Sequence, residues 1–291
     1  MITARLPRRW IEELALRYKL HPKLRDVYVE GFFDKEIIQS WLSHQGIHSP
    51  GIYSIDSVDL PIELLSKYSV TEGCKQRVIA LANELASAGH TTSALCIIDS
   101  DFDKFLGISH SSKNLLATDF SCLESYFWVD DILQSAFRSA IGAQKRKAGQ
   151  VAELEQILRG LFALRMVDQK LGLSLSWIDI KSYVKVAEGN VTIDLALYAE
   201  RVLVSSGKAN VRVAFLAEVA NLLATFPADT RHCLRGHDLV KLLSLVVRKL
   251  GGAKGFHDES AFETIMLTMC KFLDTAAGEL WPRLLIHTKP T

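Results

Sequence analysis

The chain has 291 residues, of which 48% are hydrophobic and 23% are charged, and its formal net charge is +1. This composition is ordinary for a folded protein and excludes a disordered or collagen-like chain. The balanced charge also excludes a surface that is basic throughout, so any site for nucleic acid or another polyanion must be a local patch.

Cysteine usage and hydropathy indicate the compartment. The five cysteines are scattered and never form a C-x-x-C pair, which predicts reduced thiols and neither a zinc site nor a disulfide framework. The first residues lack the apolar core of a signal peptide. No uncharged apolar run reaches the roughly 18 residues of a membrane span. We therefore expect a cytoplasmic protein with no membrane segment.

The first 130 residues alternate between strand-like and helical patterns. Strands are expected at 25–30, 51–55, 94–98 and 115–117, and helices at 8–20, at 37–42 with Asp34 as its cap, and at 72–88. The run at 94–98 is apolar throughout, as in a strand that is buried on both faces of a parallel sheet. This alternation predicts a Rossmann-like α/β domain.

The pattern changes after Gly142, where a polar, basic stretch covers 144–150. Beyond it the strand signals are weak, and helices are expected at 151–171, 193–206, 210–226, 236–250 and 259–276. The predicted organisation is an α/β domain at 1–142, which includes the N-terminal helix, and a mostly α-helical domain at 143–291.

Acidic residues follow two of the predicted strands directly. Glu30 ends the first strand, and Asp99, Asp101 and Asp103 follow the strand at 94–98. Residues i and i+2 of an extended chain point the same way, so Asp99 and Asp101 should face one cation, with Glu30 joining from a neighbouring strand. Asp103 is either a third ligand, a supporting residue or a solvated loop charge. Such carboxylates suit Mg²⁺ or Mn²⁺.

Other candidate residues also have structural interpretations. Ser121 and Glu124 fit a capping box, so Glu124 is either a cap or a functional acid. Lys75 precedes a helix and is either a surface lysine or a phosphate ligand. Arg235 and His237 belong to a basic segment at the start of a helix, where His237 would act as a general acid or contact a phosphate.

Together these segments resemble the toprim domain, the fold of topoisomerases, primases and OLD-type nucleases. The resemblance lies in Glu30-Gly31 after one strand and Asp99-x-Asp101 after a later one. Three further segments are similar to an OLD-like bacterial branch, with Ser125 where Asn is common: Gly73-x-Lys75, the stretch at 118–127 that contains Glu124, and Arg235-Gly236-His237-Asp238-Leu239.

This family includes the toprim effector of PARIS-type anti-phage systems. The resemblance implies a metal-dependent endoribonuclease that cleaves tRNA after an ABC-type ATPase partner, sensing a phage-encoded trigger, releases it. The chain has no P-loop of its own. A homodimer would fit an enzyme that holds two backbones.

The resemblance also implies roles for the site residues. Glu30 would be the general base or a metal-positioning acid, Asp99 and Asp101 would bind metal, and Glu124 would complete the shell. Lys75, Arg235 and His237 would contact the substrate. The alternatives are an OLD-type enzyme that nicks DNA and a non-catalytic toprim subunit that docks on an ATPase.

Overall fold

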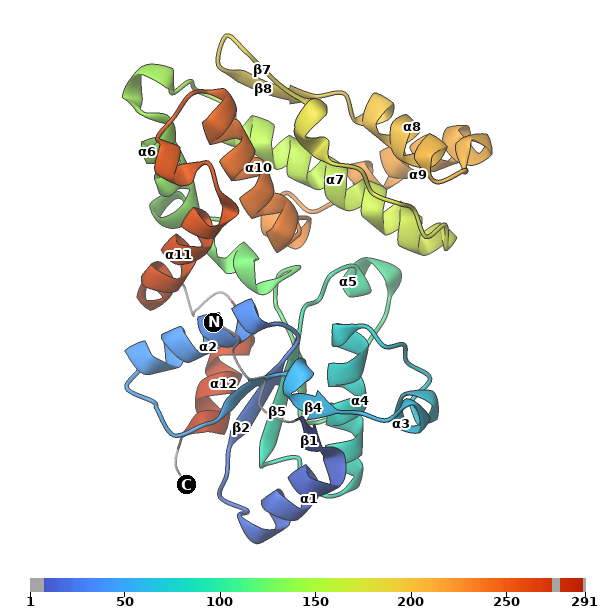
Figure 1. Cartoon of the computed structure of the whole chain (residues 1–291), viewed down its shortest axis with the longest axis vertical. Helices are drawn as coiled ribbons and strands as arrows, with labels where there is room; N and C mark the ends of the chain where they lie inside the picture. The colour runs from blue at the N-terminus through green and yellow to red at the C-terminus, as the bar shows by residue number, and fades with distance from the viewer. Residues whose placement is uncertain (1–7, 274–277, 290–291) are drawn as a thin grey trace. The chain divides into compact units, whose positions relative to one another are not determined.

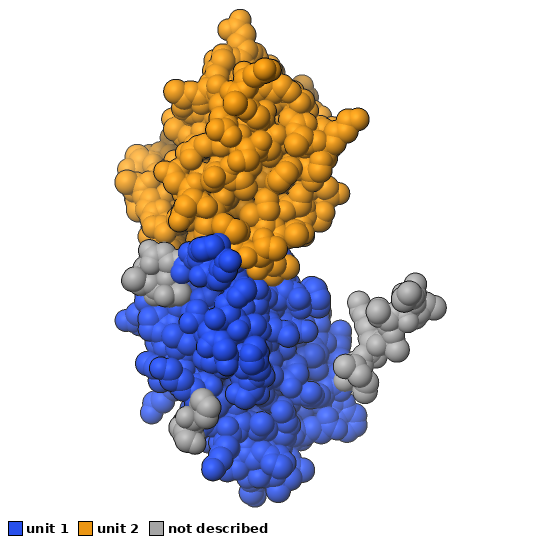
Figure 2. All heavy atoms as spheres, turned by 90° about the vertical axis from the view of Figure 1, so that its left-hand side faces the viewer, with its two compact units in different colours: residues 1–119, 270–291 blue, residues 120–269 orange. Residues whose placement is uncertain are grey.

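The structure is a computed structural model, and it describes residues 8–273 and 278–289. The chain forms two compact units, residues 1–119 with 270–291 (unit 1) and residues 120–269 (unit 2), which Figure 2 colours separately. The sequence predicts a change of character at 142–143, whereas these units divide after Asp119 and the C-terminal segment belongs to unit 1. The basic stretch at 144–150 joins two helices of unit 2.

Unit 1 contains a four-stranded sheet with helices on both sides. The strands of unit 1, inside and outside this sheet, are β1 (Arg9–Trp10), β2 (Asp26–Val29), β3 (Ile52–Ser54), β4 (Val58–Asp59), β5 (Ala94–Ile98) and β6 (Leu115–Ala117). Its helices are α1 (Ile11–Leu20), α2 (Phe32–His44), α3 (Ile62–Lys67), α4 (Cys74–Ser87), α5 (Asp103–Leu106) and α12 (Leu280–Thr288), with 3-10 turns η1 (Ile55–Ser57) and η9 (Cys270–Phe272).

The main sheet has the order β3-β2-β5-β6, and all its pairs are parallel. Asp26 pairs with Ala94 across the central strands β2 and β5, while β1 and β4 form a separate parallel pair. The chain leaves β2 toward β3 and then returns past β2 to form β5 and β6. Strand order therefore reverses between β2 and β5, where open α/β sheets place their ligands, beyond the carboxyl ends of the strands.

The core of unit 1 lies on both faces of this sheet, and β2 and β5 are buried along their whole length. Tyr28 and Cys96 pack into one hydrophobic cluster with residues of α1 and α4. On the other side, Trp41 of α2 packs on Trp281 of α12 with ring centroids 4.6 Å apart. Figure 1 shows α4 on one side of the strands and α2 with α12 on the other.

Unit 2 is mostly helical. Its helices are α6 (Ser135–Ile141), α7 (Gln150–Leu171), α8 (Leu195–Ser205), α9 (Arg212–Thr225), α10 (Gly236–Lys249) and α11 (Glu259–Met269). Short turns are η2 (Leu123–Phe127), η3 (Asp130–Gln134), η4 (Ala143–Lys145), η5 (Ile180–Ser182), η6 (Ala209–Val211), η7 (Thr230–His232) and η8 (Lys254–Phe256). An antiparallel hairpin of β7 (Val184–Ala187) and β8 (Asn190–Ile193) completes it.

The expected α/β class with a parallel sheet and a helical region is confirmed, and two expectations need correction. The hairpin of β7 and β8 occupies a region where no strand is predicted. The last predicted helix, 259–276, is shorter, because α11 ends at Met269 and a 3-10 turn follows. The expectation of no signal peptide concerns the first residues of the chain, of which 1–7 lie outside the described part, as do residues 274–276 of the last predicted helix. Within the described part, no helix has the length and apolarity needed to cross a membrane.

Candidate functional site

Two acids meet at the point where strand order reverses. β2 ends at Val29 and β5 ends at Ile98, so Glu30 and Asp99 both follow directly at the same edge of the sheet. Glu30 Oε1 accepts a hydrogen bond from the backbone N–H of Asp99 at 2.8 Å. The fold therefore brings together two residues that lie far apart in the sequence, at the edge where such sheets bind ligands.

Burial and neighbouring negative charges raise the pKa values of two acids at this site. Burial raises the pKa of Glu30 to about 8, and the charges of Asp101 and Asp34 add to the effect, while the bond from the Asp99 amide opposes it. Burial also raises the pKa of Asp34, and the charge of Asp101 contributes again. Asp34 Oδ2 accepts a hydrogen bond from the N–H of Gly31 at 2.8 Å. The helix thus begins at Phe32, before Asp34, and the Asp34 side chain reaches back to the residue preceding the helix.

Lys75 supplies positive charge to the same cluster. Its Nζ lies 3.2 Å from Asp101 Oδ2 and 2.9 Å from Asp103 Oδ2, and its side chain is only 13% exposed. Burial would lower the pKa of Lys75, but Asp101 and Asp103 outweigh burial and raise it. Asp103 also contacts His110 Nε2 at 2.8 Å. The interpretations of Lys75 as a surface lysine and of Asp103 as a solvated charge are therefore wrong.

The predicted geometry of the D-x-D pair is also wrong. β5 ends at Ile98, and Asp101 has a φ of 43°, in the left-handed region. The backbone is therefore not extended through Asp101, and the expectation that residues i and i+2 share a direction does not apply there. Asp101 nevertheless remains in the cluster through its contact with Lys75 and its effect on Glu30.

The residues suit a hard divalent ion by chemistry, although they are not arranged as a complete shell. Among the described residues, no group of three or more His, Cys, Asp or Glu side chains is placed to hold a metal. The donors are carboxylate oxygens, which Mg²⁺ and Mn²⁺ prefer. A divalent ion would also relieve the repulsion that Asp101 exerts on Glu30 and Asp34.

The segment that follows β6 has a structural role in unit 1. Thr118 Oγ1 accepts a hydrogen bond from the N–H of Ser100 at 2.9 Å, which fixes the loop after β5. The Asp119 carboxylate accepts bonds from the N–H groups of Glu279 at 2.9 Å and Leu280 at 3.1 Å, at the start of α12. These residues support the site by holding its loop and the adjoining helix.

Glu124 lies in unit 2, in a turn whose N-cap is Cys122 and not the predicted Ser121. The 3-10 turn η2 begins after Cys122, and Ser121 Oγ lies 2.9 Å from the carbonyl oxygen of Arg231. The Glu124 carboxyl group lies over Gly236, at the start of α10, so closely that a Cβ atom at Gly236 would overlap it. The fold thus joins the two motifs that contain Glu124 and Gly236 at the N-terminus of α10, where a carboxylate is electrostatically favoured.

The residues around Gly236 have different exposures. Arg235 is half-buried, while the side chain of His237 is 71% exposed with its Nδ1 3.7 Å from Glu259 Oε2. Asp238 accepts two hydrogen bonds from Arg165, at 2.8 Å and 2.9 Å, and its side chain is only 5% exposed. Asp238 therefore anchors α10 to α7, and His237 is the member of this segment that is open to solvent.

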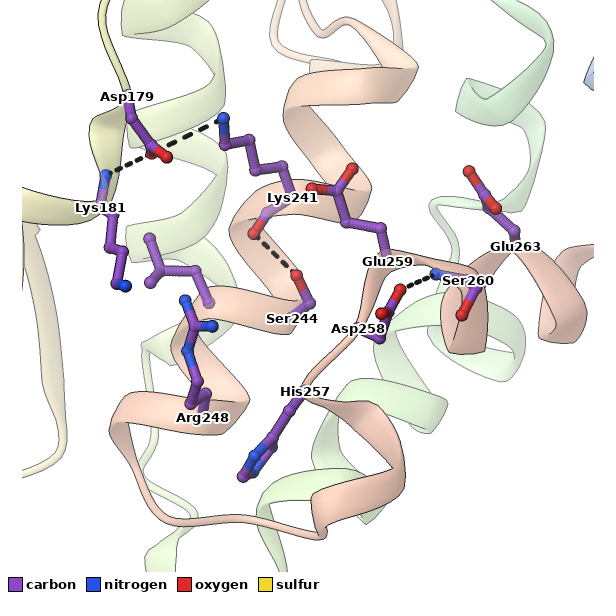
Figure 3. A pocket seen from close by; sticks show the side chains of 11 residues that line it. Asp179, Lys181, Lys241, Ser244, Arg248, His257, Asp258, Glu259, Ser260 and Glu263 are labelled. Carbon is purple, nitrogen blue, oxygen red and sulfur yellow. Dashed lines mark hydrogen bonds and ion pairs between the residues drawn. The ribbon is translucent and has the colours of Figure 1, made fainter.

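Unit 2 also contains a charged cavity that the sequence analysis missed. It has a volume of about 550 Å³, and Figure 3 shows Lys181, Lys241 and Arg248 on one side with Glu259 and Glu263 on the other. Lys241, Ser244 and Arg248 of α10 recur at the spacing of one helix face, which was the available sequence signal. The predicted site residues do not line this cavity.

A search of protein-family models and a search of curated proteins gave no match to the chain.

Proposed function

We propose that the chain is a toprim-type, Mg²⁺- or Mn²⁺-dependent endonuclease. One observation carries the proposal. Glu30 and Asp99 follow neighbouring parallel strands at the reversal of strand order and are joined by a hydrogen bond, and burial and neighbouring acids raise the pKa of Glu30 to about 8. Perturbed carboxylates at such an edge are typical of catalytic sites.

Each residue has a role in this proposal. Glu30, whose pKa lies near the pH of the cell, is suited to accept a proton from an attacking water or hydroxyl. Asp99 and Asp101 would hold the metal, which would activate the nucleophile and stabilise charge on the phosphate. Lys75 orients Asp101 and Asp103 through its two ion pairs.

The resemblance to PARIS-type effectors favours RNA as the substrate. On this proposal the chain is the toxic effector of an anti-phage system, a cytoplasmic endoribonuclease that cleaves tRNA once an ABC-type ATPase partner releases it. An OLD-type enzyme that nicks DNA shares the same acids, and the substrate assay separates the two.

One observation favours a second candidate, a non-catalytic subunit that docks on an ATPase. Asp101 and Asp103 both pair with Lys75, and no group of three acids in the described residues forms a ready metal shell. In that case the acids would stabilise the loops after β5, and replacing Glu30 would have no effect on any nucleic acid.

The test is induced expression of wild type, Glu30→Gln and Asp99→Asn in bacterial cells, with total RNA and plasmid DNA analysed on gels. Glu63→Gln, which changes an exposed acid of α3, is the matched control. We expect growth arrest and tRNA fragments with wild type and the control only. Nicked plasmid with intact tRNA would select the DNA enzyme. Cleavage that persists at the wild-type rate in Glu30→Gln would refute the assignment of the site.

A further inference from the structure

An exposed aromatic residue follows Glu30 closely in the chain. Phe32 is the first residue of α2, two positions after Glu30, and it is 68% exposed. Phenylalanine is usually buried, and other apolar residues of the same helix, including Ile37 and Trp41, are fully buried in the core. Phe32 therefore does little for the packing of unit 1.

A lysine accompanies this ring. The Nζ of Lys35 lies 5.4 Å from the centroid of the Phe32 ring, within the range of a cation–π contact. The charged, partly exposed side chains of Lys35 and Glu36 follow Phe32 in the first turns of α2. An apolar protein surface that covered the ring would have to desolvate these charges, which is costly. A flat, polar-edged group such as a nucleobase covers the ring without burying them.

We propose that Phe32 is a stacking platform for an unpaired nucleobase next to the bond that is cut, with Lys35 contacting an adjacent phosphate. This inference rests on the proposed phosphodiester chemistry and adds the class of substrate. Sites for single strands combine an aromatic face with nearby cations in this way. Bases inside a duplex are already stacked on each other, so the platform selects single-stranded or looped nucleic acid, whether RNA or DNA.

The test is binding without cleavage. The full-length protein is titrated in EDTA against fluorescein-labelled single strands of about 12 nucleotides, as RNA, as DNA and as DNA with abasic positions, and against a DNA duplex. Binding is measured by fluorescence anisotropy. We expect Phe32→Ala to weaken binding of RNA and DNA single strands by about 5- to 100-fold and Phe32→Trp to preserve it, since stacking on one residue has this magnitude. The abasic strand should bind wild type as weakly as the intact strand binds Phe32→Ala.

The control is Phe272→Ala. Phe272 is a second exposed phenylalanine of unit 1, 53% exposed, with Lys271 Nζ 4.6 Å from its ring centroid, but it does not adjoin the acids in the sequence. Because Phe32 is exposed, Phe32→Ala should unfold at the same temperature as wild type. The inference is overturned if Phe32→Ala binds within about twofold of wild type, if Phe272→Ala weakens binding equally, or if wild type binds no single strand.

Cleavage is scored separately, with Mg²⁺, in wild type and Glu30→Gln. Binding that depends on Phe32 without any cleavage would refute the nuclease and leave the platform. Cleavage that depends on Glu30, with binding independent of Phe32, would refute the platform and leave the nuclease.

Discussion

The raised pKa of Glu30 makes a sharp prediction about stability and pH. Burial and the charges of Asp101 and Asp34 raise this pKa from 4.5 to about 8. Between these values the folded protein binds a proton that the unfolded chain has lost, so stability falls as pH rises. This loss of folding stability is absent below about pH 4.5, grows up to about pH 8 and is constant above it.

The magnitude follows from the size of the shift. Each pKa unit corresponds to about 1.4 kcal/mol, so a shift from 4.5 to about 8 has an upper limit of about 5 kcal/mol. About 4 kcal/mol of this falls between pH 5 and pH 8.5. In Glu30→Gln the amide oxygen still accepts the bond from the Asp99 amide, but the group no longer ionises. The variant should therefore gain free energy of unfolding relative to wild type as pH rises.

The assay is urea unfolding in EDTA at about pH 5 and about pH 8.5, followed by tryptophan fluorescence. We expect the difference between Glu30→Gln and wild type to grow by at least about 2 kcal/mol between the two pH values. Glu63→Gln, which removes an exposed carboxyl group, should show no such growth. A difference that stays constant with pH would show that Glu30 ionises normally and would remove the physical basis assigned to the site.

Three other substitutions test the remaining contacts. Lys75→Met leaves two partly buried carboxylates without their ion pair, and urea unfolding at neutral pH should show a loss of about 3 kcal/mol that added Mg²⁺ partly restores. Gly236→Ala forces a methyl group against the Glu124 carboxyl group and should cost about 1–3 kcal/mol, and adding Glu124→Ala should recover most of this loss. Arg165→Met leaves the buried Asp238 carboxylate without its ion-pair partner and should lower the free energy of unfolding by about 3–5 kcal/mol in the same assay. The double variant Arg165→Met with Asp238→Leu should lose less.

Parts of the fold were predictable because local sequence and burial agree. The strands at 94–98 and 115–117 appear with the predicted bounds. The first is an apolar run inside the parallel sheet and is buried along its whole length, whereas the second is a short strand at the edge of the sheet. The hairpin of β7 and β8 was not predictable in this way. Its strands have few buried positions, and its turn, Glu188-Gly189, lacks the usual Asn-Gly signature although both residues adopt positive φ.

The acids of the candidate site could be located from sequence, but their partners could not. Glu30 and Asp99 are recognisable because each ends a buried strand, and parallel pairing then brings them to one edge. The ion pairs of Lys75 depend on where α4 begins relative to the turn after β5. The position of Glu124 over Gly236 depends on the packing of two distant segments. No local pattern encodes such contacts between distant segments.

The choice of a carboxylate at position 30 bears on the two candidate functions. A residue needed only to accept the hydrogen bond from the Asp99 amide would serve better as glutamine, which has the same oxygen and no charge for Asp101 and Asp34 to repel. The carboxylate lowers the stability of the folded protein at neutral pH, so it is the less favourable choice for packing alone. A group that must bind a metal or take up a proton requires that charge. The structural cost at Glu30 therefore favours the endonuclease over the docking subunit.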